Sequence, residues 1–507
     1  MAELRFFIYN DPWMDNALEN FFRLLNSLDA CSVEITEDSV NLSINSQEEF
    51  VKSLAKKVLE KRQNLIVIEK DRKTGEIKEI KKDHLLLQEE KKANGKVVFK
   101  ETLYKPDKTF EVISKIFDSK SGKNICILCG STFDKAVKSL QQASYPFVTK
   151  IASLSGVRSY KDGQVLSLKE YYDNLCPFCY LIGVLEWTDE ALVYRTFPGE
   201  KSFVFIPVFE NLKELNRFKK FCVYSGILNK TARYSNIRVN LNTDEVENTP
   251  GEYSTLLCFY EKFIENATDY LIANKWAVMQ VPFGTVKNVK LDYISIDEGI
   301  LGVIKELKEK EEIERIYSDL IKKVYFFHQG KGVIDWEITR EIQEILAKTF
   351  LLDDFRNFTK CLLPRKGGYI FFSSEVREGL EKLIFRWRWQ KMGVSKENLE
   401  VIKSVGNIIA KVSQNNTSLL YKLDKVRTVN EFWNVLREVA RKIPGLDKED
   451  LRTIKPKALD GVIQLVKEIT EKEKDGWKEV RDLLVVYSAM YYAIEKMPKG
   501  GDKNEVH

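Results

Sequence analysis

Two pairs of cysteines with the same spacing most constrain what this chain can fold into. Cys126 and Cys129 form one Cys-x-x-Cys pair, and Cys176 and Cys179 form the other. A gap of two residues lets both thiols of a pair face one metal ion, and two such pairs supply the tetrahedral four-thiolate set that suits Zn2+. We expect a structural zinc site, because four protein thiolates leave no open position that could activate water.

The residues around the cysteines favour this interpretation. Gly130 follows the first pair and Pro177 stands inside the second. Glycine relieves crowding where backbone amides bend toward sulfur, and proline restricts the turn. The pairs are separated by 46 residues, positions 130 to 175, which is longer than in a simple zinc ribbon. The alternatives are redox-active pairs and buried thiols that never meet.

The sequence predicts a multidomain α+β fold with antiparallel strands in its N-terminal part. A strand is expected from Leu4 to Tyr9, followed by a helix that Asp11 caps and Pro12 starts. Alternating apolar residues predict hairpins over residues 33–44 and 65–80.

Helical periodicity dominates from residue 251 onward. A helix is expected over residues 300–321, and Thr428 and Glu431 form a capping-box pattern ahead of an apolar stripe. The expected domains are an N-terminal α+β region (1–124), an inserted four-cysteine zinc module with strands (125–250), a mainly helical continuation (251–391) and a C-terminal helical bundle (392–507).

Composition narrows the function classes. The 507 residues include 80 Lys+Arg and 75 Asp+Glu, and the net charge of +5 does not by itself indicate a nucleic-acid partner. Only three histidines are present, which argues against metal-dependent hydrolases and nucleophiles activated by a histidine base. We find no secretory signal, no phosphate-binding glycine loop and no membrane span, and we expect a cytoplasmic protein that is not an enzyme.

Local basic clusters are the candidate nucleic-acid contacts. Arginine and lysine bind phosphates, whereas arginine, tyrosine and asparagine together suit base edges or unstacked bases. For the stretch from Arg233 to Arg238, the alternative is a polar loop without a binding role. The candidate residues are Arg217, Lys219 and Lys220; Arg233, Tyr234, Asn236 and Arg238; and Arg365 and Lys366.

The cysteine pairs, the opening segment and the helical C-terminal part together resemble a known family. They are similar to the CXXC–CXXC group of large subunits of type I CRISPR surveillance complexes (Cascade), most like subtype I-B. The opening residues 11–17, Asp-Pro-Trp-Met-Asp-Asn-Ala, resemble the acidic-Pro-aromatic-x-Asp segment of that family, although small residues are commoner where Asn16 and Ala17 stand. Only the zinc ligands can be carried over by position.

The resemblance implies a binding role in antiviral defence without catalysis. Such a subunit lies near the 5′ handle of the CRISPR RNA (crRNA), beside the backbone and handle-binding subunits. It recognises a short protospacer-adjacent motif in double-stranded DNA, aids duplex opening and recruits a helicase–nuclease. This division matches RNA-guided recognition, in which base pairing reads the sequence and protein reads the short motif.

The resemblance also implies a small helical subunit, which in subtype I-B can be made by internal translation of the large-subunit gene. Met392 stands just ahead of the expected bundle and is the candidate start; the alternative is an ordinary helical methionine. Two other functions remain open for the whole chain. One is a free-standing, zinc-stabilised nucleic-acid-binding regulator or processing factor, and the other is an enzyme with an unrecognised site.

Overall fold

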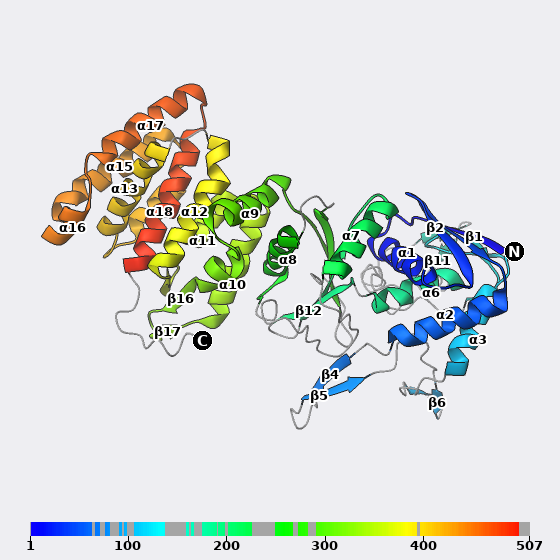
Figure 1. The fold of residues 1–507 in the computed structure, drawn as a ribbon. Helices are drawn as coiled ribbons and strands as arrows, with labels where there is room; N and C mark the ends of the chain where they lie inside the picture. Colours follow the sequence, from blue (N-terminus) through cyan, green and yellow to red (C-terminus); the bar gives the residue numbers. More distant parts are fainter. Residues whose placement is uncertain are drawn as a thin grey trace. The chain divides into compact units, whose positions relative to one another are not determined.

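The structure of the chain is a computed structural model with two compact units (Figure 1). Unit 1 comprises Met1–Asn248 and Asn266–Ser295, and unit 2 comprises Thr249–Glu265 and Ile296–His507. The structure describes residues 2–62, 66–70, 77–81, 91–93, 96–98, 106–136, 159–161, 164–166, 175–189, 191–197, 201–225, 249–266, 272–281, 291–392 and 396–495.

Unit 1 combines helices with small antiparallel sheets. Its helices are α1 (Pro12–Leu25), α2 (Gln47–Arg62), α3 (Pro106–Phe117), α6 (Pro177–Leu185), a short 3-10 helix (Glu186–Thr188) and α7 (Leu212–Ser225). Its strands are β1 (Ala2–Phe7), β2 (Cys31–Ile35), β3 (Ser39–Ile44), β4 (Ile66–Lys70), β5 (Ile77–Lys81), β6 (Lys91–Ala93), β7 (Lys96–Val98), β8 (Asn124–Ile125), β9 (Thr132–Phe133), β10 (Ser159–Lys161), β11 (Gln164–Leu166), β12 (Val193–Phe197), β13 (Lys201–Pro207), β14 (Lys275–Val281) and β15 (Leu291–Ser295).

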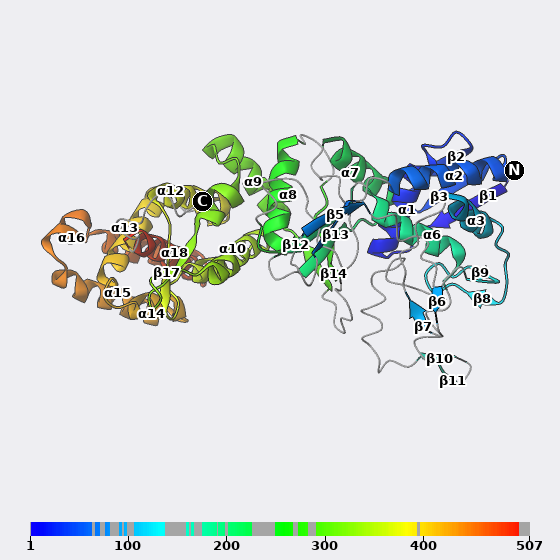
Figure 2. The ribbon, with the colours of Figure 1, turned by 90° about the horizontal axis from the view of Figure 1, so that it is seen from below.

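Helix α1 lies at the centre of unit 1. It contacts α6 and α7, strand β2 of the antiparallel β1-β3-β2 sheet, and strand β13 of the antiparallel β12-β13-β14-β15 sheet (Figures 1 and 2). The Asp11 side chain caps the helix by accepting a hydrogen bond from the Met14 amide. Pro12 occupies the first turn, where the backbone N–H that proline lacks would have no partner within the helix. Trp13, Leu18 and Phe21 are fully buried, so the opening segment forms part of the core of the unit.

Unit 2 is mostly helical. Its helices are α8 (Glu252–Asn266), α9 (Glu298–Glu311), α10 (Trp336–Leu351), α11 (Phe355–Cys361), α12 (Ser374–Met392), α13 (Lys396–Val412), α14 (Ser418–Lys425), α15 (Val429–Lys442), α16 (Lys448–Thr453), α17 (Ala458–Lys472) and α18 (Trp477–Glu495). A π-helical turn (Ile316–Leu320) and two 3-10 helices (Ile321–Lys323 and Ile443–Gly445) complete the helical part. Strands β16 (Tyr325–His328), β17 (Val333–Ile334) and β18 (Gly368–Phe371) form one small antiparallel sheet.

Aromatic and helix–helix packing hold unit 2 together. α18 packs along α13 and also contacts α11, α14 and α17 (Figure 1). The Trp387 ring makes edge-on contacts, at centroid distances of 5.1–5.2 Å, with Phe350, Phe355 and Phe358, and its indole N–H donates to Asp353. Trp387 is therefore a core residue of unit 2.

The expected fold class is confirmed: an antiparallel α+β part, a four-cysteine cluster and C-terminal helices are all present. The first hairpin is β2–β3, strands β4 and β5 pair over residues 66–81, and Thr428 and Glu431 form the capping box of α15. The prediction of one continuous helix over residues 300–321 is wrong about where the helix ends. It ends at Glu311 because Glu312 adopts a left-handed φ of 59°, and a π-helical turn follows. No described helix is both long enough and apolar enough to cross a membrane.

Candidate metal centre

The first cysteine pair lies in the loop of the short β8–β9 hairpin. The Cys126 amide donates to the Ser131 carbonyl at 2.9 Å, and the Gly130 amide donates to the Cys126 carbonyl at 2.9 Å. Gly130 has a φ of +73°, a left-handed conformation that side chains disfavour. The glycine thus lets the loop turn back directly after Cys129, as its position in the sequence predicts.

The second cysteine pair forms the first turn of helix α6. Cys176 is the N-cap, Pro177 is the first helical residue, and the Cys179 amide donates to Cys176 Sγ at 3.4 Å. A helix N-terminus presents unpaired amides and a partial positive charge, which favour thiolates over thiols. The proline therefore starts a helix here, where the sequence suggested only a fixed turn.

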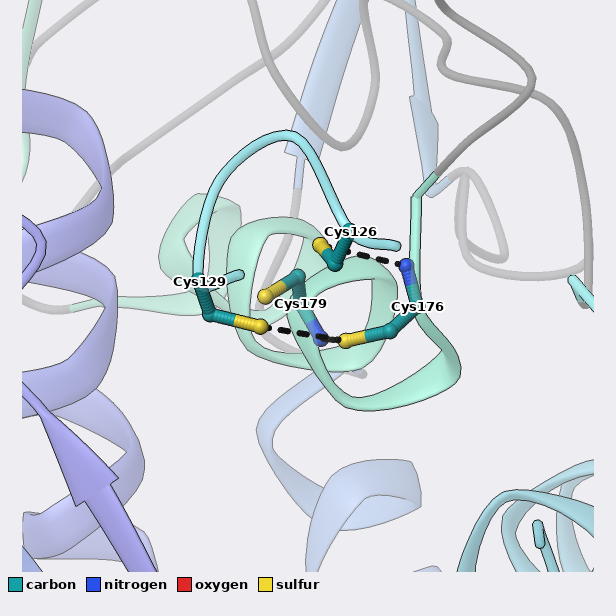
Figure 3. Close-up of side chains that lie close together, drawn as sticks. All are labelled: Cys126, Cys129, Cys176 and Cys179. Carbon is teal, nitrogen blue, oxygen red and sulfur yellow. Dashed lines mark hydrogen bonds between the residues drawn. The ribbon is translucent and has the colours of Figure 1, made fainter. Parts of the chain in front are cut away.

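The two pairs converge on one point (Figure 3). All four sulfurs lie within 4.8 Å of one another, and Cys129 Sγ and Cys176 Sγ are 3.7 Å apart. Bonds of about 2.3 Å to a tetrahedral metal ion place sulfurs roughly 3.8 Å apart, so the cluster fits such an ion. Cys126, Cys176 and Cys179 are buried and Cys129 is exposed, which places the centre at the edge of the core.

The four-cysteine cluster is built into the core of unit 1. The ring of Phe178, between the second pair of cysteines, packs edge-on against Phe6 at 5.5 Å and Phe117 at 5.2 Å. The Trp13 indole N–H donates to the Gly183 carbonyl of α6 at 3.2 Å. Loss of the metal would therefore disturb the contacts between α6 and the opening segment as well as the cysteine loops.

One further side chain contacts the sulfurs. The Tyr9 hydroxyl lies 3.3 Å from Cys179 Sγ and donates to it when the sulfur is a thiolate. Burial, and then the nearby Cys179 sulfur, raise the pKa of Tyr9 well above its usual value. Burial also raises the pKa of Cys179, whereas hydrogen bonding from Cys126 lowers that of Cys129. Sequence reasoning missed Tyr9 because 170 residues separate it from Cys179.

We predict that Tyr9→Phe weakens metal binding without removing it. Groups that hydrogen-bond to metal ligands commonly contribute about 10–100-fold to affinity. Competition with a chromophoric chelator should show a fall in Zn2+ affinity within that range. Tyr293→Phe is the control, because Tyr293 is an exposed tyrosine of the same unit. Equal affinities for Tyr9→Phe and the unsubstituted chain would show that the hydroxyl does not support the centre.

Lys219, expected to contact nucleic acid, is instead a buried structural cation, and this expectation is corrected. Its side chain is 1% exposed, and Nζ lies 2.6 Å from Asp189, 3.4 Å from Glu186 and 3.4 Å from Glu19. Arg23 pairs with Glu19 at 2.8 Å and also with Asp189. We call these five side chains the buried ion cluster.

Burial and neighbouring charges shift the pKa values of the carboxyl groups in the buried ion cluster. Burial raises the pKa of Glu186 well above its usual value, which favours the protonated form of this carboxyl. Burial acts on Asp189 in the same direction, but Arg23 and Lys219 overcome it and hold the pKa of Asp189 below its usual value. Arg23 and Lys219 thus both lie against the carboxyl groups of Glu19 and Asp189.

The other candidate nucleic-acid contacts fall in different places. Arg217 and Lys220 are exposed on α7, the helix whose inner face carries Lys219. In unit 2, Lys366 is exposed, whereas Arg365 is half-buried and pairs with Glu341 at 3.3 Å. Arg233, Tyr234, Asn236 and Arg238 lie outside the described residues. Met392 is the last residue of α12.

Comparison with known proteins adds no family assignment. No protein-family model matches the chain. A search of curated proteins also finds no match. The function must therefore be argued from the residues and their geometry.

Proposed function

We propose that this chain is the large subunit of a type I CRISPR RNA-guided surveillance complex. In this role it lies near the crRNA 5′ handle beside the backbone and handle-binding subunits, and recognises the protospacer-adjacent motif in double-stranded DNA. It then aids duplex opening and recruits the helicase–nuclease, and performs no catalysis itself. The proposed location is the cytoplasm.

The observation that carries this proposal is that its two sequence signatures meet in one core. The acidic-Pro-aromatic opening forms α1, and the second cysteine pair starts α6, which packs along α1. Trp13 and Tyr9 join the two directly, through Gly183 and Cys179. This supports treating the signatures as parts of a single module.

We propose that the metal is Zn2+ with a structural role. A set made only of thiolates that lie within 4.8 Å of one another suits Zn2+, and four protein ligands leave no open coordination position. The ion would join the β8–β9 loop to the N-terminus of α6. Elemental analysis of protein purified without chelator should find one zinc per chain.

A free-standing zinc-stabilised nucleic-acid-binding regulator or processing factor is the second candidate. Exposed Arg217, Lys220 and Lys366 are compatible with either function, because all three can contact phosphates. The two candidates differ in whether other subunits and a guide RNA are required.

Purification of the tagged chain from its own host, followed by RNA sequencing and mass spectrometry, tests the proposal. The surveillance complex predicts short RNAs that share one 5′ end, together with repeated backbone subunits. A monomer without RNA that binds nucleic acid alone would support the free-standing protein and overturn the complex. Turnover of a nucleic-acid substrate by the chain alone would contradict both.

We also propose that Met392 starts a second, shorter product that serves as the small helical subunit. Such a product would begin just before α13 and lack Glu381 and Arg356. In the full chain, Glu381 pairs with Lys403 at 3.0 Å, and Arg356 pairs with Asp424 at 2.7 Å. The short product would therefore expose charges that need other partners.

Changing the Met392 codon to leucine is expected to abolish the short product and leave the full chain unaffected. Leucine is a good helix former of similar volume, so α12 should be preserved. Immunoblotting with a C-terminal tag gives the readout, and Met490→Leu, in buried α18, is the control. A short band that persists after the Met392 change would rule out this start.

A further inference from the structure

The small sheet of unit 2 has one buried face and one aromatic face. Strands β16 and β18 are antiparallel neighbours, with Tyr325 opposite Phe371 and Phe327 opposite Tyr369. Because side chains alternate between the faces of a sheet, these four aromatic residues share one face. Phe326 and Ile370 point the other way and are each 1% exposed.

The aromatic residues form a surface that is half-exposed except at Phe371, which is 8% exposed. The Phe327 and Tyr369 rings stack with centroids 5.4 Å apart and an interplanar angle of 27°. The Tyr325 and Phe371 rings lie 5.6 Å apart at 32°. Trp336, which is 47% exposed, meets the Tyr325 ring edge-on at 6.0 Å. Tyr325, Phe327 and Tyr369 each keep part of their surface exposed.

Basic residues stand at both ends of this surface. The strands and their adjoining loops, residues 322–334 and 365–371, contain five basic residues and no acidic one. Lys322 and Lys323 precede β16, whereas Lys331 and Lys366 lie in loops at its other end, and all four are exposed. Two of the five basic residues lie close to an acidic side chain. Asp335 lies 3.8 Å from Lys331, and Glu341 pairs with Arg365.

From this juxtaposition we propose that the aromatic face of the β17-β16-β18 sheet binds single-stranded nucleic acid by base stacking. Tyr325, Phe327, Tyr369 and Trp336 form the stacking surface, and Lys323, Lys331 and Lys366 contact the phosphates. A purely apolar protein partner would offer no negative charges to the lysines at both ends of the surface. Stacking on aromatic rings tolerates any base, so the surface binds without strong sequence preference.

This inference rests on the proposal that the chain binds nucleic acid, and it adds which form of nucleic acid this surface binds. A duplex keeps its base faces stacked inside the helix, so the rings can reach bases only in an unpaired strand. The surface is therefore expected to prefer single strands. In a complex that opens a DNA duplex, the natural occupant is an unpaired strand.

The test uses the full chain and a fluorescently labelled oligothymidylate of roughly 15 nucleotides. Tyr325→Leu and Tyr369→Leu keep apolar volume but remove the ring faces. Each is expected to weaken binding at least about fivefold, and the double variant about 30-fold. Lys366→Gln should weaken binding and reduce its salt dependence by about one phosphate contact. Tyr293→Leu, an exposed tyrosine in unit 1, is the control and should bind like the unsubstituted chain.

Photocrosslinking keeps the test valid if a variant folds poorly. Oligonucleotides that carry 4-thiothymidine should crosslink to peptides from residues 322–336 and 365–371 of the unsubstituted chain. Equal binding by the leucine variants, or crosslinks only elsewhere, would overturn the stacking surface. Loss of a protein partner in the same variants with unchanged oligonucleotide binding would also overturn it.

The outcome for this surface is separable from that for the proposed function. A chain that purifies with guide RNA and backbone subunits, but whose leucine variants bind normally, would overturn the surface alone. A chain that binds the oligonucleotide through this face but never carries RNA or other subunits would overturn the proposed function alone.

Discussion

Replacing Cys176 by serine is expected to abolish metal binding and to destabilise unit 1. Serine is itself a favoured N-cap, so the variant keeps the start of α6 while it removes one thiolate. A metal present at about 1,000 times its Kd contributes roughly 4 kcal/mol to the free energy of unfolding. In a unit of this size, that loss lowers the melting temperature by roughly 8–16 °C.

Elemental analysis and thermal unfolding of the purified variant measure both effects. Cys31→Ser is the matched control, because Cys31 is a half-buried cysteine of the same unit that lies outside the cluster. The control should keep one metal per chain and nearly unchanged stability. If Cys176→Ser keeps full stability, and the unsubstituted chain never contains metal, the four thiols have no structural ion.

Chelation should reproduce the effect of Cys176→Ser in the unsubstituted chain. Binding energy at a structural site is also folding energy, so removal of the ion should loosen α6 and the β8–β9 loop. The Trp13 and Phe178 contacts connect these elements to the opening segment. Protease sensitivity is therefore expected to rise near both cysteine pairs and near α1.

The four-cysteine cluster could be predicted from the sequence, but the side chains that pack around it could not. Spacing within each pair is a local property, and it identified all four cysteines. The contact between Tyr9 and Cys179 depends on tertiary packing that joins β1 to α6, and no local pattern encodes it. The same holds for the Phe178 contacts with Phe6 and Phe117.

The error at Lys219 had a signal that could have prevented it. Lys219 follows Leu215 by four residues and precedes Cys222 by three, so it lies on the apolar face of α7. The neighbouring residues Arg217 and Lys220 point outward. Basic residues that are close in sequence therefore lie on opposite faces of the helix. Helical periodicity is a better guide to which of them are exposed than local charge density is.

The buried ion cluster leads to the second large prediction, for Lys219→Met. Methionine fills the space of the lysine stem but leaves Arg23 alone against the carboxylates of Glu19 and Asp189. Removing one partner of a buried pair typically destabilises by about 3–5 kcal/mol, because a charge stays buried without compensation. The melting temperature should fall by roughly 6–20 °C.

Lys220→Met provides a matched control on the next residue of the same helix. Lys220 is exposed and lies 5.9 Å from the ring centroid of Phe22. Its replacement should change the free energy of unfolding by less than about 0.5 kcal/mol. Equal stability of the Lys219 and Lys220 variants would show that Lys219 does not stabilise the core.

The pH dependence identifies the mechanism behind the Lys219→Met effect. The pKa of Asp189 lies below its ordinary value of 3.8, so its contribution is present above that pH and is lost as the pH falls through the folded pKa. Burial acts to lower the pKa of Lys219, but the nearby acidic groups, Asp189 above all, outweigh it and raise the pKa above its ordinary value of 10.5. The stability difference between Lys219→Met and the unsubstituted chain should therefore be complete between pH 3.8 and 10.5 and shrink in stronger acid.

The double variant Lys219→Met with Asp189→Asn separates charge from packing. Asparagine removes the carboxylate that Lys219 approaches most closely, so Arg23 then faces Glu19 alone and the charges balance again. We expect the double variant to recover at least about 1 kcal/mol relative to the sum of the single changes, since the two residues share one network. Strictly additive losses would mean that the lysine acts through its stem. A positive coupling would instead mean that Lys219 is retained inside the core to neutralise Asp189, and so is unavailable to a nucleic acid.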